Sequence, residues 1–190
     1  MGPVTATGVM AAEIVELLVS PLHRYEGRPA DGPRPAGGPE LSPEIEVRAG
    51  LGVVGDRYFG RAAHVRASVT FQSVEALEAL AESLGVPVPG LAETRRTVLL
   101  RGVDADALGG RDFSIDCGDG PLLFRGHRPA NPCGWMDVVI AGGAHRAMRG
   151  RGGIRTEPLS SGMLRVGPVA VVVGEPPDEA LAYHRPSSAQ

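Results

Sequence analysis

Short runs of apolar residues, separated by turn-forming residues, recur along most of the chain. Such runs, when bounded by Gly, Pro or Ser, are typical of strands. They lie at residues 14–19, 44–48, 68–71, 97–100, 113–116, 122–124, 163–166 and 169–173. The Gly-Asp-Gly sequence at residues 118–120 separates two of them and predicts a β-hairpin. The pattern therefore predicts a chain built mainly of strands.

A helical pattern is clear only at residues 73–84. Its apolar residues recur at helical spacing and form one stripe, made of Val74, Leu77, Leu80, Ala81 and Leu84. Ser73 is suited to cap the start of this helix and Gly85 to end it. Shorter helical turns are expected at residues 104–110 and 144–148. Many strands and few short helices predict a mainly β fold, a β-barrel, rather than an alternating α/β sheet.

The chain of 190 residues is long enough for one domain with a substantial core. We expect the barrel domain to occupy residues 13–175, between a flexible N-terminus at residues 1–12 and a C-terminal tail at residues 176–190. Residues 27–43 are rich in Pro and Gly. This composition predicts an irregular, exposed excursion between two strands.

Residue usage and charge exclude several kinds of chemistry. All 19 basic residues are arginines, so the chain has no lysine for a Schiff base or for the phosphate-binding loop of nucleotide hydrolases. A net charge of −3 does not favour nucleic acid. No stretch approaches the roughly 20 apolar residues of a membrane span, and the N-terminus lacks a secretory pattern. We therefore expect a cytoplasmic protein that binds neither nucleic acid nor membrane.

The sequence GLGVVG at residues 50–55 matches the glycine pattern of dinucleotide-binding folds. That function requires a helix that starts at the turn and points its N-terminus at the pyrophosphate. The following residues, 56–60, carry no helical stripe. Two interpretations remain: a tight turn with a structural role, or an anchored loop at residues 55–57 from which Arg57 reaches a ligand.

Side chains able to bind or react with a ligand are most concentrated in two segments, RGHRPANPCGWMD at residues 125–137 and GRGGIR at residues 150–155. Guanidinium groups bind phosphate or carboxylate through two hydrogen bonds. The Gly-Gly pair in the second segment would let backbone N–H groups approach an anion. Arg128 and a protonated His127 would lower the pKa of the Cys133 thiol if they point at it, and only a thiolate ligates metal or attacks. The pattern favours a thiolate site next to an anion site over a buried structural cysteine.

Several segments, in this order, resemble the MOSC domain, the C-terminal domain of molybdenum cofactor sulfurases and of the mitochondrial amidoxime-reducing enzymes, which also occurs as standalone bacterial proteins. They are GDR at residues 55–57, RRTVLLRG at 95–102, RPANPC at 128–133, RGGIR at 151–155 and GMLRVG at 162–167. The Pro132-Cys133 pair ahead of the basic glycine turn is the most specific of these features. The resemblance covers residues 14–173.

The resemblance implies a mostly antiparallel β-barrel, similar to the pyruvate-kinase barrel, and a pterin-based molybdenum cofactor. It implies that Cys133 coordinates the molybdenum and is the catalytic position. The cofactor, through its phosphate above all, would be held by the other residues of the matching segments, Arg57, Arg95, Arg96, Thr97, Arg128, Arg151 and Arg155. Two positions depart from the family: Thr97 stands where Asn is frequent, and Asn131 where many members have Cys or Glu.

Three functional hypotheses remain open at this stage. The first is a molybdenum-dependent oxidoreductase that reduces N-hydroxylated or related small molecules with electrons from a separate reductase. The second is a carrier that delivers the cofactor or its sulfur without turnover. The third is a barrel whose cysteine is inert.

Among single residues, one of Arg95 and Arg96 is expected to face the ligand, because neighbours in a strand point to opposite faces. Which of the two does so stays open. Cys117 matches no motif. His64, Asp137 and Trp135 are weaker candidates for a place in the site.

Overall fold

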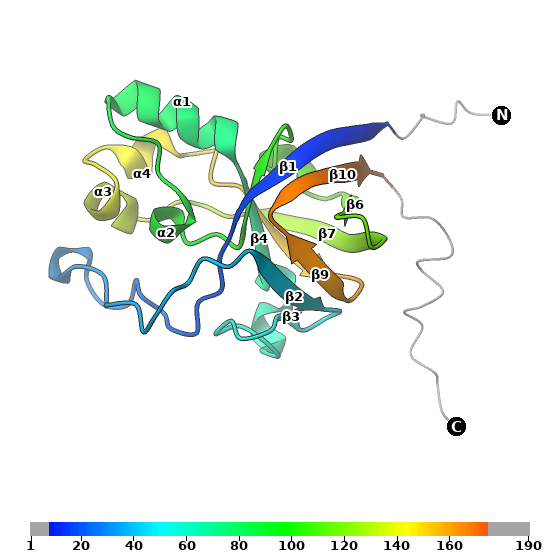
Figure 1. Cartoon of the computed structure of the whole chain (residues 1–190). Helices are drawn as coiled ribbons and strands as arrows, with labels where there is room; N and C mark the ends of the chain where they lie inside the picture. The colour runs from blue at the N-terminus through cyan, green and yellow to red at the C-terminus, as the bar shows by residue number, and fades with distance from the viewer. Residues whose placement is uncertain (1–7, 175–190) are drawn as a thin grey trace.

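Seven strands close into a barrel in this computed structural model, which describes residues 8–174 (Figure 1). Around the barrel the order is β1 (Val9–Leu17), β10 (Gly167–Val173), β6 (Asp112–Asp116), β7 (Pro121–Pro129), β8 (Ile154–Pro158), β4 (Val69–Ser73) and β5 (Val98–Arg101). Neighbours are antiparallel except for the parallel pair β4 and β5. The expected mainly β barrel is confirmed.

A second, three-stranded sheet lies beside the barrel in the order β3 (Gly52–Val53), β2 (Glu44–Arg48) and β9 (Gly162–Arg165) (Figure 1). The GLGVVG segment begins in the turn that follows β2, contains the short strand β3 and ends in the next turn. Gly52 has φ 99°, and a Cβ there would lie 2.7 Å from the Cβ of Ser68, so only glycine fits. No helix starts at this turn. The predicted tight turn is confirmed.

The four α-helices gather on one side of the barrel (Figure 1). They are α1 (Val74–Leu84), α2 (Leu91–Thr94), α3 (Trp135–Val139) and α4 (Ala144–Ala147). Three 3-10 turns complete the helical elements of the described residues: η1 (Pro29–Asp31), η2 (Ala62–Ala67) and η3 (Asp106–Leu108). The longest, α1, ends at Gly85 as predicted. Within residues 8–174, none of these helices has the length and apolar character needed to cross a membrane.

Two apolar cores result from this layering. Inside the barrel, Phe71, Phe113 and Phe124 pack against one another with ring centroids 5.1–5.5 Å apart. Aromatic pairs in such geometry add about 0.5–1.5 kcal/mol each beyond their buried area. The second core lies under the helices and includes Leu77 and Trp135. The strands between the two cores are therefore covered on both faces, and their ends meet the helical layer.

Two boundaries differ from the sequence-based expectation. β1 begins at Val9, which pairs with Val172 of β10, so residues 9–12 belong to the barrel instead of a flexible N-terminus. Ser73 precedes α1 but does not cap it: its hydroxyl donates to the carbonyl of Val103 and accepts from the N–H of Ala105. The C-terminal tail predicted at residues 176–190 lies outside the described residues.

Candidate functional site

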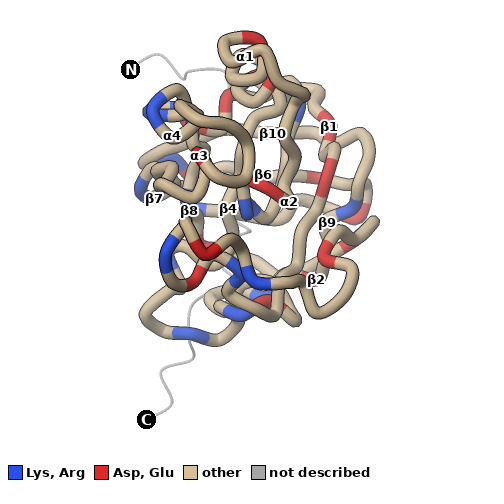
Figure 2. The backbone as a smooth tube through the Cα atoms, turned by 90° about the vertical axis from the view of Figure 1, so that its left-hand side faces the viewer, with Lys and Arg blue, Asp and Glu red and all other residues tan. Residues whose placement is uncertain are grey.

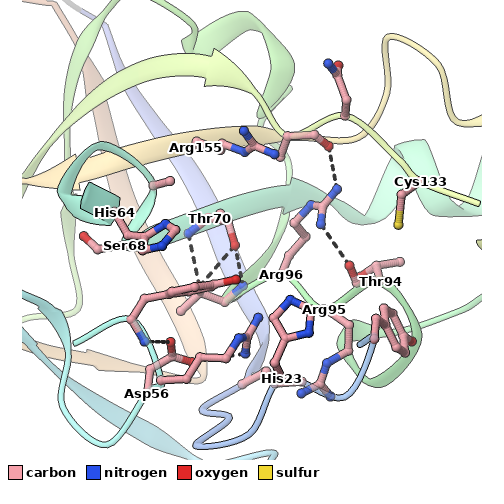
Figure 3. Close-up of a pocket in the computed structure, with 18 of the residues that line it drawn as sticks. His23, Asp56, His64, Ser68, Thr70, Thr94, Arg95, Arg96, Cys133 and Arg155 are labelled. Carbon is pink, nitrogen blue, oxygen red and sulfur yellow. Dashed lines mark hydrogen bonds and ion pairs between the residues drawn. The ribbon is translucent and has the colours of Figure 1, made fainter. Parts of the chain in front are cut away.

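A cavity of about 500 Å³ opens where β4, β5, β7 and β8 meet η2 and the start of α3. Figure 2 shows arginine segments around the ends of β4 and β8, and Figure 3 shows Arg96 in the cavity between Cys133 and His64. Most of the predicted site residues lie together here. The cavity is lined by Cys133, Thr97, Arg57, Arg95, Arg96, Arg128 and Arg155.

Cys133 lies directly ahead of the first turn of α3. Its carbonyl oxygen accepts the N–H of Met136 at 3.0 Å, and its side chain is exposed. A buried structural cysteine is therefore wrong for this position. Trp135 is instead the buried member of this segment and stacks on Tyr25, with ring centroids 5.1 Å apart. The indole is used in packing, and it fixes the backbone that presents the thiol.

Tyr25 forms part of the cavity wall beside Cys133. Its hydroxyl donates to the carbonyl oxygen of Glu93 at 2.5 Å. Burial raises the pKa of Tyr25 to about 12. The phenol therefore stays neutral and ties residues 21–25 to α2.

Arg95 is held by a carboxylate from the Pro- and Gly-rich excursion. Its two terminal nitrogens donate to Glu40 at 2.7 and 2.6 Å, and its side chain is 6% exposed. Ser20 and Arg24 also donate to Glu40. Hydrogen bonding from Arg95, above all, lowers the pKa of Glu40 to about 2. The charge of Arg95 is therefore neutralised within the protein.

Arg96 has a different set of partners. Its guanidinium donates to the carbonyl oxygens of Gly152 at 2.8 Å, Thr94 at 3.0 Å and Ala130 at 2.5 Å. No carboxylate pairs with it among the described residues. Burial and then the neighbouring charge of Arg155 lower its pKa to about 10. Carbonyl dipoles satisfy its donors but leave its charge uncompensated.

The expected alternation of Arg95 and Arg96 does not apply, because both precede β5. Arg95 ends α2 in the left-handed conformation, with φ 58°, and both side chains line the cavity. Thr97 follows them and links the parallel strands: its Oγ1 accepts the N–H of Thr70 at 3.1 Å, and its N–H donates to the Oγ1 of Thr70 at 2.9 Å. Thr97 thus joins β4 to the segment that precedes β5 at the edge of the cavity.

Arg57 lies on an anchored loop, as predicted. The carboxylate of Asp56 accepts the N–H groups of Tyr58 and Ser20 at 2.9 and 3.2 Å. The guanidinium of Arg57 stacks over the ring of Tyr58 at 4.4 Å. Its Nε is buried without an acceptor among the described residues. An unsatisfied buried donor costs free energy, so an acceptor from a ligand would be favourable here.

The glycine turn does not form the expected backbone anion site. A Cβ at Gly152 would lie 2.3 Å from the carbonyl oxygen of Ala130, and one at Gly153 would lie 2.0 Å from that of Phe71. The N–H of Gly153 already donates to Asp106 at 3.0 Å. The two glycines are therefore required for close packing of this turn against its neighbours.

Arg151, at the start of this turn, lies away from the cavity. It lines a separate hollow between α1 and η3, so its expected contact with the cofactor has no support in this arrangement. Arg155, four residues later on β8, does reach the cavity. It lies opposite Thr70 in the β4–β8 pair.

Other candidates also have different surroundings from those expected. His127 is outside the cavity, and its Nε2 lies 3.2 Å from Glu157, so it does not act on the thiol. Asp137 accepts the N–H of His145. Cys117 is outside the cavity too, and burial raises its thiol pKa. His64 does line the cavity, where it packs on Tyr58 at 4.5 Å.

Cys133 is the one thiol that lines the cavity, and His23, His64 and Asp56 line it as well. Within residues 8–174 no group of three or more His, Cys, Asp or Glu side chains is placed to hold a metal ion. A metal bound at Cys133 would therefore have to arrive with its other ligands.

Solved structures support the fold assignment. YuaD from Bacillus subtilis aligns with a TM-score of 0.67 at 17% identity, over 90% of this chain and 100% of that protein. YiiM from Geobacillus stearothermophilus aligns with a TM-score of 0.58 at 15% identity, over 86% and 75%, and YiiM from Escherichia coli with 0.52 at 14%, over 92% and 79%. No family model and no curated protein matches the sequence. The chain has a MOSC-like fold.

Proposed function

We propose that the cavity binds a molybdenum cofactor, with Cys133 as the protein's ligand to the metal. The observation that carries this proposal is an exposed thiol at a cavity whose arginines are not all neutralised. A soft thiolate suits molybdenum, and guanidinium groups suit a phosphate.

The residues present fit this cofactor. A single cysteine is sufficient for a metal that is carried by its own organic ligand, and within residues 8–174 no cluster of three or more His, Cys, Asp or Glu side chains offers an all-protein metal site. Arg96 and Arg155 would hold the phosphate, and the buried Nε of Arg57 offers one further donor. When bound, the cofactor supplies two-electron redox chemistry.

We propose an oxidoreductase that acts on N-hydroxylated or related small molecules. Trp135 and Tyr25 would shield one side of the bound cofactor from water, and Cys133 would hold the metal as a thiolate. Electrons would come from a separate reductase. Cys133 is also exposed, which favours one alternative: a carrier that presents the cofactor to another protein.

Molybdenum and pterin analysis of the purified protein tests cofactor binding. After expression in a host that makes the cofactor, we expect both in the wild type. Cys133→Ser should fold normally but lose molybdenum, because a serine oxygen is too hard and too basic to replace the thiolate. Cys117→Ser is the matched control and should keep both. Unchanged molybdenum and unchanged reductase activity in Cys133→Ser would refute the proposal.

A reductase assay with an artificial electron donor separates the two functions. Turnover of an N-hydroxylated substrate by the molybdenum-loaded wild type supports the enzyme. A loaded protein that transfers its cofactor to an acceptor protein without any turnover supports the carrier.

A further inference from the structure

The cavity holds more positive charge than a cofactor phosphate requires. Arginine supplies seven of the lining side chains, against a single lining carboxylate, Asp56. Arg24 and Arg95 pair with Glu40, and Arg57 lies 3.8 Å from Asp56. Within the described part of the chain, four lining arginines have no carboxylate partner. They are Arg66, Arg96, Arg128 and Arg155.

Two of these four form an inner pair. Arg96 is fixed by three carbonyl oxygens at the cavity floor, and Arg155 lies close enough to depress its pKa, after the larger effect of burial. A phosphate dianion placed beside this pair would balance both charges. The inner pair therefore accounts for the phosphate of the proposed cofactor.

The other two form an outer pair that this phosphate leaves unmatched. Arg66 lies on η2 and Arg128 near the end of β7, and both are exposed at the cavity. β8, the strand that carries Arg155, pairs with β7 and contacts η2. Arg66 and Arg128 thus lie on the two elements, η2 and β7, that adjoin the strand of Arg155.

This local charge is opposite in sign to that of the whole chain, whose net charge is −3. A cleft lined by one sign of charge raises the local concentration of ligands of the other sign. Tyr58 and His64 also line the cavity with their ring centroids 4.5 Å apart, and the guanidinium of Arg57 lies over the Tyr58 ring.

We infer that the substrate of this site is itself an anion, a small N-hydroxylated compound that carries a carboxylate bound by Arg66 and Arg128. The inference rests on the proposed function, because it names the substrate class of the same site. Benzamidoxime and para-carboxybenzamidoxime are a suitable pair of probes, since they share the reacting group and differ in charge.

For the molybdenum-loaded wild type we expect kcat/KM to be at least about tenfold higher for the carboxylated probe than for benzamidoxime. One charged hydrogen bond has an effect of this size. This preference should shrink as salt is added. Arg66→Gln should reduce the preference several-fold. Arg61→Gln is the control, because Arg61 is exposed next to η2 but does not line the cavity. Equal kcat/KM for the two probes in the wild type would overturn the inference.

Calorimetric binding of the inert analogues benzamide and terephthalamate separates this inference from the proposed function. We expect terephthalamate to bind about tenfold more tightly, with the same response to Arg66→Gln. If the purified protein binds no molybdenum, the proposed function is refuted. The affinities of that same sample for the two analogues still test whether the site prefers an anion. Equal affinities, or a preference that Arg66→Gln and Arg61→Gln change alike, refute the anionic substrate.

Discussion

Arg95 and Arg96 are consecutive and line the same cavity, but they belong to regions with different electrostatics. The wall formed by residues 20–43 provides Arg95 with the carboxylate of Glu40. The floor formed by residues 128–155 provides Arg96 only with carbonyl oxygens. Both guanidinium groups are well hydrogen-bonded, so a count of hydrogen bonds does not distinguish the two regions.

The difference lies in what remains after the hydrogen bonds are made. A carboxylate removes the charge of its partner, whereas a carbonyl dipole satisfies a donor and leaves the positive charge in place. The wall is therefore complete in the free protein. The floor gains from a ligand that brings negative charge, which is the property expected of a binding site.

The largest expected effect comes from removing the carboxylate of the wall that pairs with Arg95. Glu40→Gln removes the carboxylate and leaves the buried guanidinium of Arg95 without a counter-charge. We expect a loss of about 3–5 kcal/mol in the free energy of unfolding, measured by urea denaturation. Glu26→Gln is the control: Glu26 pairs with Arg34 on the surface, and such pairs contribute about 0–1 kcal/mol. Similar losses for both variants would contradict the difference between wall and surface.

The second largest effect is expected from acid, because protonation of Glu40 removes the negative charge that neutralises Arg95. The pKa of Glu40 falls from 4.5 to about 2, mainly because of hydrogen bonding from Arg95. A depressed folded-state pKa adds stability that is complete above the unfolded-state pKa and is lost as the pH falls through about 2. We expect about 3 kcal/mol of the unfolding free energy to disappear over this window, as measured by denaturation curves at each pH. Glu40→Gln should show a shallower dependence, and an equal slope would be evidence against this assignment.

The floor is tested by Arg155→Ala. This change removes one charge of the inner pair, and we expect cofactor retention to weaken by about 1.5–3 kcal/mol, the contribution of a charged hydrogen bond. Fluorescence of the oxidised pterin measures retention. Arg151→Ala is a matched control from the same segment, since Arg151 lies in a different hollow. Equal losses in the two variants would contradict the placement of the phosphate.

The smallest effect is the response of protein without cofactor to inorganic phosphate. If the floor lacks negative charge, phosphate at about ten times its dissociation constant should stabilise the fold by about 1.4 kcal/mol, seen as a rise in Tm. Arg155→Ala should reduce this rise and Arg151→Ala should not. A rise that is the same in all three proteins would show that phosphate acts elsewhere.

Local patterns in the sequence predicted much of the barrel. The helix at residues 73–84 and the hairpin around residues 118–120 both formed as expected, because apolar spacing and turn residues act over short distances. The hairpin is held by Asp116, whose carboxylate accepts the N–H groups of Gly118 and Gly120.

The site was predicted in part, through residues that share a segment with Cys133 or resemble a family motif. Glu40 was missed because its partner Arg95 is 55 residues away and no local pattern links them. Arg66 and Tyr25 lie in segments without a motif. The Gly152-Gly153 pair was misinterpreted, because sequence alone does not tell a glycine that admits a ligand from one that admits a neighbouring backbone.

β1 joins the two ends of the barrel sheet. It pairs with β10 through residues 9–14 and with β5 through residues 13–17. The contact between β1 and β10 connects residues more than 150 positions apart, and contacts of long sequence separation slow folding. During synthesis β1 has to wait for the last strand to emerge before the barrel closes. The order of events on the ribosome is therefore set by a single strand: the wall is translated early and the floor late, and the final geometry of both is reached only after β10 arrives.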